Sequence, residues 1–383
     1  MGSVEKRTRK NKNGKVTTFY LARWREPGTE KQPSKSFTKK TDAENHVIEM
    51  EGDKLRGEYI AANAGKITFR AYTAEWLAAR TFDPNTRQHV VSRLDLHVLP
   101  VLGDKTLDAI KPLTVQGWLK GLEDKLAGSS RQVIFVHVSS ILASAVDDGL
   151  IRKNPCKAKS VTVPKAEPKR VIPWESTTVE TVKTKIFERY KVVVALGAGL
   201  GLRQGEIFGL SLDDFDFKRG MVRVQRQVKV VDGAKYFDLP KYDKVREVPV
   251  AQSVREAVEL HVKKFRPVLV TLPWKKEGGK EVTANLLVTS QYGIPPAFQS
   301  FNGTWKRALR AAKVPDTAAN GCHVLRHTYA SALLHHGESV KALAEYLGHA
   351  DPGFTLRTYT HLMKGSDERA RAAVDKMFGV TGV

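Results

Sequence analysis

The chain has 383 residues, and its 41% apolar content is enough to bury a core in each of two or three domains. It contains no apolar run of the ~18 residues that a membrane span needs and no signal peptide at its start, so we expect no membrane partner and a cytoplasmic location. The formal net charge of +22 favours nucleic acid over an anionic membrane surface, because each Lys or Arg placed against a phosphate releases a condensed counterion.

Residues 1–62 are expected to form a small basic module with a short sheet and a helix. The predicted elements are a turn at Asn13-Gly14, strands over residues 17–25 and 35–38, and a helix over residues 41–57. A sheet of this kind can lie in a DNA groove, and we expect Arg23 and Arg25 to contact DNA there. The alternative is a solvated basic tail in which Trp24 is structural.

Residues 67–155 are expected to form a helical domain. Their apolar residues recur at helical intervals, and Pro84 and Pro112 stand where first helical turns begin. The four predicted helices lie near residues 69–77, 84–98, 112–119 and 129–149. Four helices joined by short loops predict a compact bundle.

Residues 156–172 have the composition of a basic linker, in which lysines and prolines alternate without apolar periodicity. Such a segment is extended and can reach around a duplex, so we expect DNA contacts from Lys165, Lys169 and Arg170. Residues 173–383 then mix helices with strands, and the predicted strands cover residues 221–228, 246–250 and 285–288. The fold class is therefore multidomain and mainly α with small β-sheets, the last domain being α+β.

The end of the chain is expected to be a helix with one apolar face. Its apolar residues follow the spacing i, i+3, i+4, i+7 and i+8, and they are Ala370, Ala373, Val374, Met377 and Phe378. This face could dock on a neighbouring subunit or on its own domain, and the sequence favours neither.

Four short stretches of residues 173–383 carry groups suited to one reaction, the exchange of phosphodiester bonds without a metal or cofactor. They are Gly201-Leu202-Arg203-Gln204-Gly205-Glu206, Lys241, His323-Val324-Leu325-Arg326, and Leu347-Gly348-His349 followed by Tyr359. The pentavalent transition state gathers charge on two non-bridging oxygens, and two guanidiniums are a natural clamp for them. Arg203 and Arg326 are the candidates for this clamp.

The other groups in these stretches can supply the remaining chemistry. The phenol of Tyr359 could attack phosphorus and form a covalent phosphotyrosine. The leaving 5′ oxygen needs a proton, which Lys241 could give, and His349 could donate a hydrogen bond to the phosphate. His323 lies three residues before Arg326 and can exchange a proton or donate a hydrogen bond. Glu206 would share a helix face with Arg203 if the helix continues, and would hold the angle of that arginine.

This order of residues resembles the active-site series of tyrosine recombinases of the phage integrase family. The similarity is strong over residues 173–365, rests on pattern alone in the helical segment, and is weaker over the first sixty residues, which resemble the arm-binding domains of lambda-type integrases. It implies an integrase that recombines double-stranded DNA through a covalent 3′-phosphotyrosine, binds core and arm attachment sites, and acts as a homotetramer. Whether a DNA-bending protein or a directionality factor takes part, and whether integration, excision or dimer resolution is the main role, stays open; the basic N-terminal module favours integration of a phage or mobile element.

Several assignments keep alternatives. The spacing from His349 to Tyr359 is ten residues where about nine is expected, and the turn at residues 351–353 could absorb the difference. Tyr329 and Tyr346 are alternative nucleophiles, although each lies in an apolar helical run. Lys235 and Lys244 are close enough to compete with Lys241.

Other readings of the chain are weaker. Residues 339–349 could be half of a helix-turn-helix, which would make the protein a DNA-binding regulator without cutting activity. A metal-dependent nuclease lacks its carboxylate cluster, and Asp213, Asp214 and Asp216 are expected in a loop. The two cysteines, Cys156 and Cys322, suit a reducing compartment and give no metal-ligand spacing. The histidines without an assigned chemical role, expected to be structural or solvated, are His327, His335 and His336.

Overall fold

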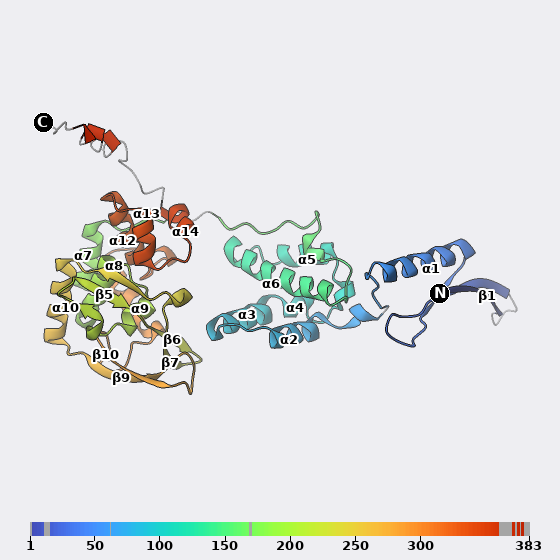
Figure 1. The fold of residues 1–383 in the computed structure, drawn as a ribbon, viewed down its shortest axis with the longest axis horizontal. Helices are drawn as coiled ribbons and strands as arrows, with labels where there is room; N and C mark the ends of the chain where they lie inside the picture. The colour runs from blue at the N-terminus through green and yellow to red at the C-terminus, as the bar shows by residue number, and fades with distance from the viewer. Residues whose placement is uncertain are drawn as a thin grey trace. The chain divides into compact units, whose positions relative to one another are not determined.

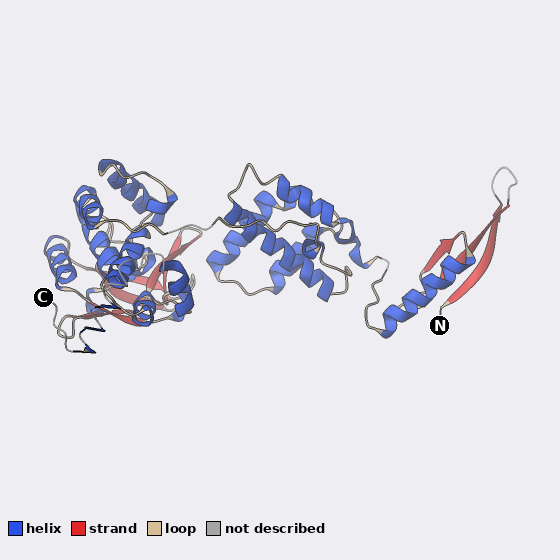
Figure 2. Cartoon of the chain, turned by 90° about the horizontal axis from the view of Figure 1, so that it is seen from above, coloured by secondary structure: helices blue, strands red, loops and turns tan. Residues whose placement is uncertain are grey.

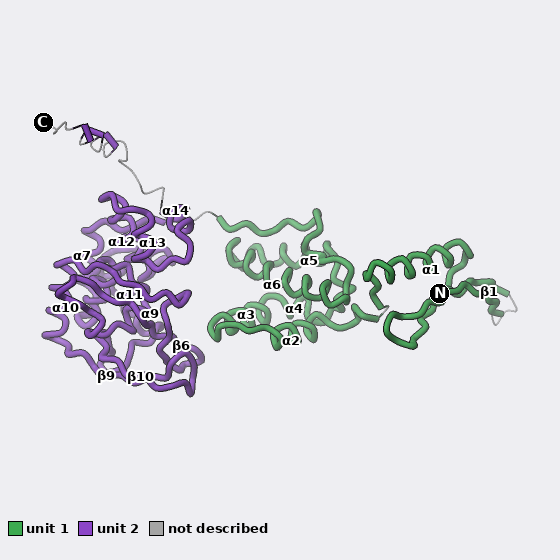
Figure 3. Tube along the Cα trace, in the orientation of Figure 1, with its two compact units in different colours: residues 1–168 green, residues 169–383 purple. Residues whose placement is uncertain are grey.

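The computed structural model describes residues 2–10, 16–61, 63–167 and 171–359, and six residues near the C-terminus (370, 371, 374, 375, 377 and 378). The chain divides into two compact units, residues 1–168 and 169–383 (Figure 3). Both are mainly helical with small antiparallel sheets, as the sequence predicts. No helix among the described residues combines the length and the apolar character needed to cross a bilayer.

The first unit begins with a three-stranded antiparallel sheet and one helix (Figure 2). The elements are β1 (Ser3–Lys10), β2 (Val16–Arg23), β3 (Ser34–Phe37) and α1 (Lys40–Leu55). The strand β1 was not predicted, because its polar and basic residues show no apolar alternation. It forms through its pairing with β2, from Ser3 opposite Arg23 to Lys10 opposite Val16.

Trp24 is part of the small core of this module. Its side chain is 5% exposed, its ring meets that of His46 edge-on, and its Nε1 donates a 2.9 Å hydrogen bond to the hydroxyl of Tyr59. Trp24 is therefore structural, within a folded module rather than a solvated tail.

The helical bundle follows in the same unit. Its helices are α2 (Phe69–Ala79), α3 (Pro84–His97), the one-turn α4 (Leu99–Leu102), α5 (Pro112–Lys120) and α6 (Gly128–Asp147). The side chains of Thr68 and Asp83 cap α2 and α3 by accepting hydrogen bonds from Ala71 and Asn85 backbone N–H groups. The four predicted helices are present, and α4 is an additional turn whose Leu102 is fully buried.

The segment after the bundle packs along the bundle instead of leaving it. A 3-10 turn, η3 (Pro155–Lys157), is followed by Val161, which is 8% exposed in the bundle core. The backbone N–H of Thr162 donates a 2.8 Å hydrogen bond to Oε1 of Gln116. The part of the predicted linker before Lys165 is therefore an extension of the bundle.

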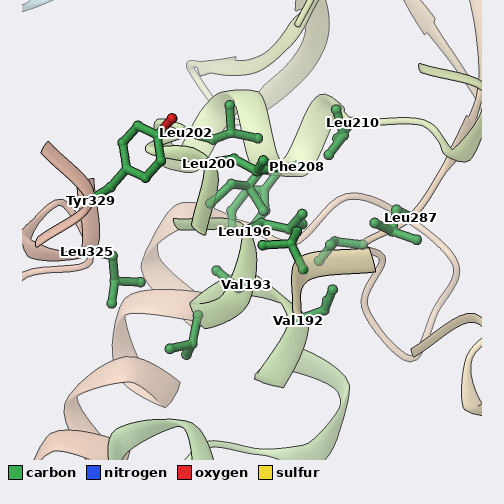
Figure 4. Packing of buried hydrophobic residues seen from close by; sticks show 14 of the residues in the cluster. Val192, Val193, Leu196, Leu200, Leu202, Phe208, Leu210, Leu287, Leu325 and Tyr329 are labelled. Carbon is green, nitrogen blue, oxygen red and sulfur yellow. The ribbon is translucent and has the colours of Figure 1, made fainter. Parts of the chain in front are cut away.

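The second unit surrounds the nearly all-apolar helix α8 (Lys191–Leu200) (Figures 1 and 4). Val193, Leu196 and Leu200 of α8 are fully buried and pack against residues such as Leu325 and Phe208. The other helices are α7 (Ser176–Lys185), α9 (Gln204–Gly209), α10 (Gln252–Lys264), α11 (Phe298–Ala311), α12 (Val324–His335), α13 (Val340–Leu347) and α14 (Pro352–Tyr359).

Three small antiparallel sheets lie among the described residues of this unit. Their strands are β4 (Phe215–Asp216), β5 (Met221–Val224), β6 (Gln227–Val231), β7 (Ala234–Asp238), β8 (Arg246–Pro249), β9 (Val268–Pro273) and β10 (Glu281–Leu286). The single strand predicted over residues 221–228 is wrong: it is divided into β5, which pairs with β8, and β6, which pairs with β7. The division lies at Gln225 and Arg226, whose side chains both donate 2.7 Å hydrogen bonds to Asp214.

The end of the chain is described only in part. Three of the apolar residues there are exposed, Val374 by 51%, Met377 by 72% and Phe378 by 73%. Ala373 lies outside the described residues, as do most of the residues after Tyr359.

Candidate active site

A break between two helices places Arg203. The helix α8 ends at Gly201, which has a φ of +63°, and a Cβ there would come within 2.4 Å of the Tyr329 ring, so glycine is required. Arg203 is the N-cap of the next helix, α9, and Glu206 is its third residue. The expectation that one continuous helix aligns these two residues is therefore wrong.

Glu206 reaches back to Arg203 in a capping arrangement. Its Oε2 accepts a 2.9 Å hydrogen bond from the backbone N–H of Arg203, and its Oε1 accepts another of 2.9 Å from the Nη1 of that guanidinium. The carboxylate thus fixes both the backbone and the side chain of Arg203. This is the orienting role expected for Glu206, reached through a different local geometry.

Arg246, which the sequence interpretation did not single out, is the second partner of Glu206. Its Nη1 and Nη2 donate hydrogen bonds of 3.0 and 2.8 Å to the two carboxylate oxygens, and its Nε donates one of 2.6 Å to the Tyr346 carbonyl. Burial alone would raise the pKa of Glu206, but Arg246 and Arg203 outweigh it and lower that pKa to about 2. The sequence feature that could have identified Arg246 is the alternation along β8, which puts this arginine on the same buried face as Val248.

Arg326 lies at the centre of the cluster, on the first turn of α12. Its side chain is 1% exposed, and its guanidinium donates hydrogen bonds to the carbonyl oxygens of Gly201 (2.8 Å) and Leu347 (2.5 Å). Burial, and then the proximity of Arg203, lower the pKa of Arg326. No carboxylate bonds it directly among the described residues, so this buried cation favours an anionic ligand such as a phosphodiester.

His349 follows Gly348, the left-handed C-cap of α13 with a φ of +64°. It is buried, and its Nδ1 shares a 2.6 Å hydrogen bond with the hydroxyl of Thr355, which is fully buried on α14. Burial and the charge of Arg326 lower the pKa of His349 to about 3, so its ring is neutral near pH 7. Thr355 is a second residue that the sequence did not indicate.

Tyr359 ends α14 with its side chain 1% exposed. Its hydroxyl lies 2.8 Å from Nδ1 of His327, and the two rings are 5.7 Å apart between centroids. Burial raises the pKa of Tyr359 to about 12 against the opposing effect of Arg326 and Arg203. The interpretation of His327 as structural or solvated missed this contact, although its position beside Arg326 in sequence was a usable signal.

The alternative tyrosines lie differently. Tyr329 is 7% exposed within the hydrophobic core, where its ring packs beside Gly201. Tyr346 is partly buried and offers its backbone carbonyl to Arg246.

His323 and Lys241 differ in their relation to the cluster. His323 is the N-cap residue of α12, and its ring meets that of His327 edge-on at 4.8 Å. Burial, and then the proximity of His327 and Arg326, lower the pKa of His323 to about 4. Lys241 is exposed at the start of η6 (Lys241–Asp243), with its Nζ 5.1 Å from the ring centroid of Tyr242.

The two competing lysines are each bonded to a backbone carbonyl. The Nζ of Lys235 donates a 2.8 Å hydrogen bond to the Pro295 carbonyl, and the Nζ of Lys244 donates one of 2.9 Å to the His349 carbonyl. The structure therefore brings a set of predicted groups within electrostatic reach of one another: Arg203, Glu206, His323, Arg326, His349 and Tyr359. No hydrogen bond joins Lys241 to them among the described residues.

The expected DNA-contacting residues that the structure describes belong to the first unit, whereas this cluster belongs to the second. Arg23 is at the end of β2 with its side chain 41% exposed and 3.9 Å from Glu5, and Arg25 is exposed just beyond. Lys165 is exposed, whereas Lys169 and Arg170 lie outside the described residues. The aspartates 213, 214 and 216 occupy the predicted connection between helix and strand, within η5 (Leu212–Asp214) and β4.

Two family models match the chain, the phage integrase family over residues 176–365 and the phage integrase central domain over residues 69–160. A XerC-like tyrosine recombinase of Caldanaerobacter subterraneus subsp. tengcongensis is 30% identical over 61% of this chain, which spans only 62% of that relative. The putative prophage phiRv2 integrase of Mycobacterium tuberculosis is 26% identical over 98% of both chains, and the integrase of Mycobacterium phage L5 is 26% identical over 87% of this chain and 86% of its own.

Two kinds of solved structure share the fold. The Tn1549 transposon integrase in complex with a circular intermediate DNA has a TM-score of 0.67 at 23% identity, over 81% of this chain and 99% of its own. A lambda integrase tetramer bound to a Holliday junction has a TM-score of 0.58 at 17% identity, over 90% of this chain and 96% of its own.

Proposed function

The chain belongs to the phage integrase family of tyrosine recombinases, and we propose that it cuts and rejoins DNA at specific sites through a covalent bond between Tyr359 and a 3′ phosphate. One observation carries the residue assignment. The hydroxyl of Tyr359 is buried within the electrostatic reach of Arg203 and Arg326, and Arg326 has no carboxylate bonded to it among the described residues. A phosphate held by these two arginines would meet the phenol directly.

The proposed reaction needs no metal or cofactor. The phenol oxygen of Tyr359 forms a bond to phosphorus, the bond from phosphorus to the 5′ oxygen breaks, and that oxygen takes a proton from Lys241. Arg203 and Arg326 bind the two non-bridging oxygens, where charge grows in the transition state. His323 and His349 donate further hydrogen bonds to the phosphate. Attack by the 5′ hydroxyl of another strand reverses these steps and rejoins the DNA.

The proposed partner is double-stranded DNA, bound by three parts of the chain. Residues 67–155 and 173–383 would bind the core of the site, with Lys165, Lys169 and Arg170 of the segment between them against the backbone. Residues 1–62 would bind separate arm sites through Arg23 and Arg25, and the tether would add avidity.

Exchange between two duplexes requires four active sites, so we assign the active form as a homotetramer on DNA. The exposed basic strand β1 supports the arm-binding role of the N-terminal module and, with it, integration of a phage or mobile element in the cytoplasm. A DNA-bending protein and a directionality factor are compatible with this scheme.

The test is a nicked suicide substrate, which releases a short strand on cleavage and traps the protein on DNA. Wild-type protein should form a covalent adduct in the presence of EDTA. Tyr359→Phe should bind the same DNA and form none, because a phenyl ring has no nucleophile. Tyr292→Phe is the matched control, since this tyrosine is 78% exposed, and it should form the adduct normally.

Two outcomes contradict the proposal. An adduct that survives Tyr359→Phe places the nucleophile elsewhere, with Tyr329 and Tyr346 the first residues to test. If the wild type binds DNA specifically without forming any adduct, the alternative function, a DNA-binding regulator without cutting activity, is favoured.

A further inference from the structure

We propose that His327 is a further catalytic residue, which holds the hydroxyl of Tyr359 in place and accepts its proton as the oxygen attacks phosphorus. This inference rests on the proposed function, because it assigns a partner to the nucleophile named there. Its evidence is a direct contact: Nδ1 of His327 lies 2.8 Å from the hydroxyl of Tyr359.

The contact joins the two helices that carry the chemistry. His327 follows Arg326 on α12, and Tyr359 is the last residue of α14, thirty-two positions later in the chain. The planes of the two rings are inclined by 58°. The residue that binds phosphate and the residue that holds the nucleophile are thus adjacent on one rigid helical turn, which keeps their separation constant.

A proton acceptor is needed because the phenol is not ionised on its own. With a pKa of about 12, only about one Tyr359 in 10⁵ is phenolate at pH 7. Burial and the charge of Arg326 lower the pKa of His327 to about 4, so this imidazole is neutral and its Nδ1 can accept a hydrogen bond. A phosphodiester that neutralises part of the charge on Arg326 would raise the pKa of His327 when a base is required.

The other titratable groups around this pair are less well placed to take the proton. His323 faces the ring of His327 edge-on, and its pKa is likewise lowered to about 4, but no hydrogen bond joins it to the hydroxyl of Tyr359 among the described residues. The Nδ1 of His349 is already bonded to Thr355. Arg203 and Arg326 act on the hydroxyl by their positive charge, which favours the phenolate without removing its proton.

The proposed step balances. As the oxygen of Tyr359 forms its bond to phosphorus, the phenol proton moves to Nδ1 of His327, and the 5′ oxygen leaves with a separate proton from Lys241. When the strands rejoin, the imidazolium returns its proton to the phenol oxygen as the bond between that oxygen and phosphorus breaks. His327 therefore ends the cycle neutral, as it began.

The test uses His327→Asn in the full chain. The asparagine amide can keep a hydrogen bond near the Nδ1 position, but it cannot take a proton. We expect the rate of adduct formation on the suicide substrate to be about 10² lower at pH 7, in line with the loss of a general base. We also expect that rate to rise about tenfold per pH unit from pH 7 to 9 as the phenol ionises, while the wild-type rate stays flat.

The matched control is His336→Asn, at the exposed C-terminal end of the same helix, which should keep the wild-type rate and pH profile. Urea unfolding and DNA affinity identify a variant that fails only because it is misfolded, and His327→Gln then serves as the second variant with the same expected pH profile. A His327→Asn rate within threefold of wild type, or a slow rate that does not change with pH, overturns the proposal. Either result leaves the proposed function intact if the wild type forms an adduct that Tyr359→Phe abolishes.

Discussion

At the scale of single residues, the site is defined by an excess of guanidinium groups around one carboxylate. Glu206 bonds Arg203 and Arg246, whereas Arg326 bonds only carbonyl oxygens among the described residues. A buried cation in such surroundings is costly unless an anion completes the arrangement. A bound substrate phosphate would therefore supply the negative charge that Arg326 lacks as a direct partner.

Lys241 is the catalytic assignment that the geometry supports least, and chemistry can test it. Lys241→Ala should slow the cleavage of an ordinary substrate by about 10²-fold or more, which is the contribution typical of a general acid. A substrate with sulfur at the bridging 5′ position should restore the rate, because a thiolate leaves without a proton. Single-turnover adduct formation measures both rates.

Lys235→Ala and Lys244→Ala are the matched controls, since each of these lysines is bonded to a backbone carbonyl. Both should retain most of the wild-type rate. If instead Lys244→Ala is slow and recovers on the sulfur substrate, the general acid is Lys244.

At the scale of elements, Glu206 joins the start of α9 to the strand β8. The bidentate pair with Arg246 links residues forty positions apart in the chain. The bonds to Arg203 fix the first residue of the capping arrangement, where the connection from α8 meets α9. This buried carboxylate therefore positions the clamp by fixing the two elements that frame it.

Replacement of Glu206 should reduce stability strongly. Glu206→Gln leaves two arginines without their counter-charge, and we expect the free energy of unfolding to fall by about 3 kcal/mol in urea titrations at pH 7. Glu247→Gln is the control, because this neighbouring carboxylate forms only an exposed pair with Arg219 and should cost less than about 1 kcal/mol.

The same carboxylate predicts a pH dependence. The pKa of Glu206 is lowered from 4.5 to about 2 on folding, so its contribution to stability is complete above about pH 4.5 and is lost as the pH falls toward 2. Wild-type protein should lose stability over that interval by more than Glu206→Gln does. Equal losses in the two proteins would contradict the assignment of this ion pair.

The N-terminal sheet is the second element whose role can be separated. Arg23→Gln together with Arg25→Gln should weaken binding to arm DNA. The slope of the logarithm of the binding constant against the logarithm of the salt concentration should also fall, by the amount expected for about two lost phosphate contacts. Adduct formation on a core suicide substrate should not change. Lys39→Gln together with Lys40→Gln, at the start of the helix α1, removes the same two charges and is the control. Equal weakening by that variant would show that the effect is only one of net charge.

At the scale of the whole molecule, the C-terminal residues bear on assembly. Val374, Met377 and Phe378 are exposed in the single chain, which leaves apolar surface for a neighbouring subunit. Deletion of residues 366–383 should abolish tetramer formation on paired sites, measured by native gel electrophoresis, while half-site cleavage continues. If the deletion variant forms synaptic complexes in the normal amount, the helix does not dock on a neighbouring subunit. A lower free energy of unfolding of the unbound variant would indicate that the helix docks on its own domain.

The sequence by itself determined the chemistry that this chain can perform and much of its local structure. The order of Arg203, His323, Arg326, His349 and Tyr359 indicated the family, because reaction type depends on which groups are present. The four long helices of residues 67–155 were also predicted, since their apolar periodicity and caps are local features. The strand β1 was not, because only its pairing with β2 makes it a strand.

Only the tertiary structure decided how these groups are held. Arg246 meets Glu206 across forty residues, and Thr355 meets His349 across a turn. His327 meets Tyr359 because α12 and α14 both pack against α13. Such contacts depend on which faces of distant elements are buried together, and no local pattern contains that information. The break after α8 at the left-handed Gly201 was likewise not predicted, and there the ring of Tyr329, distant in sequence, fills the space that a Cβ would occupy.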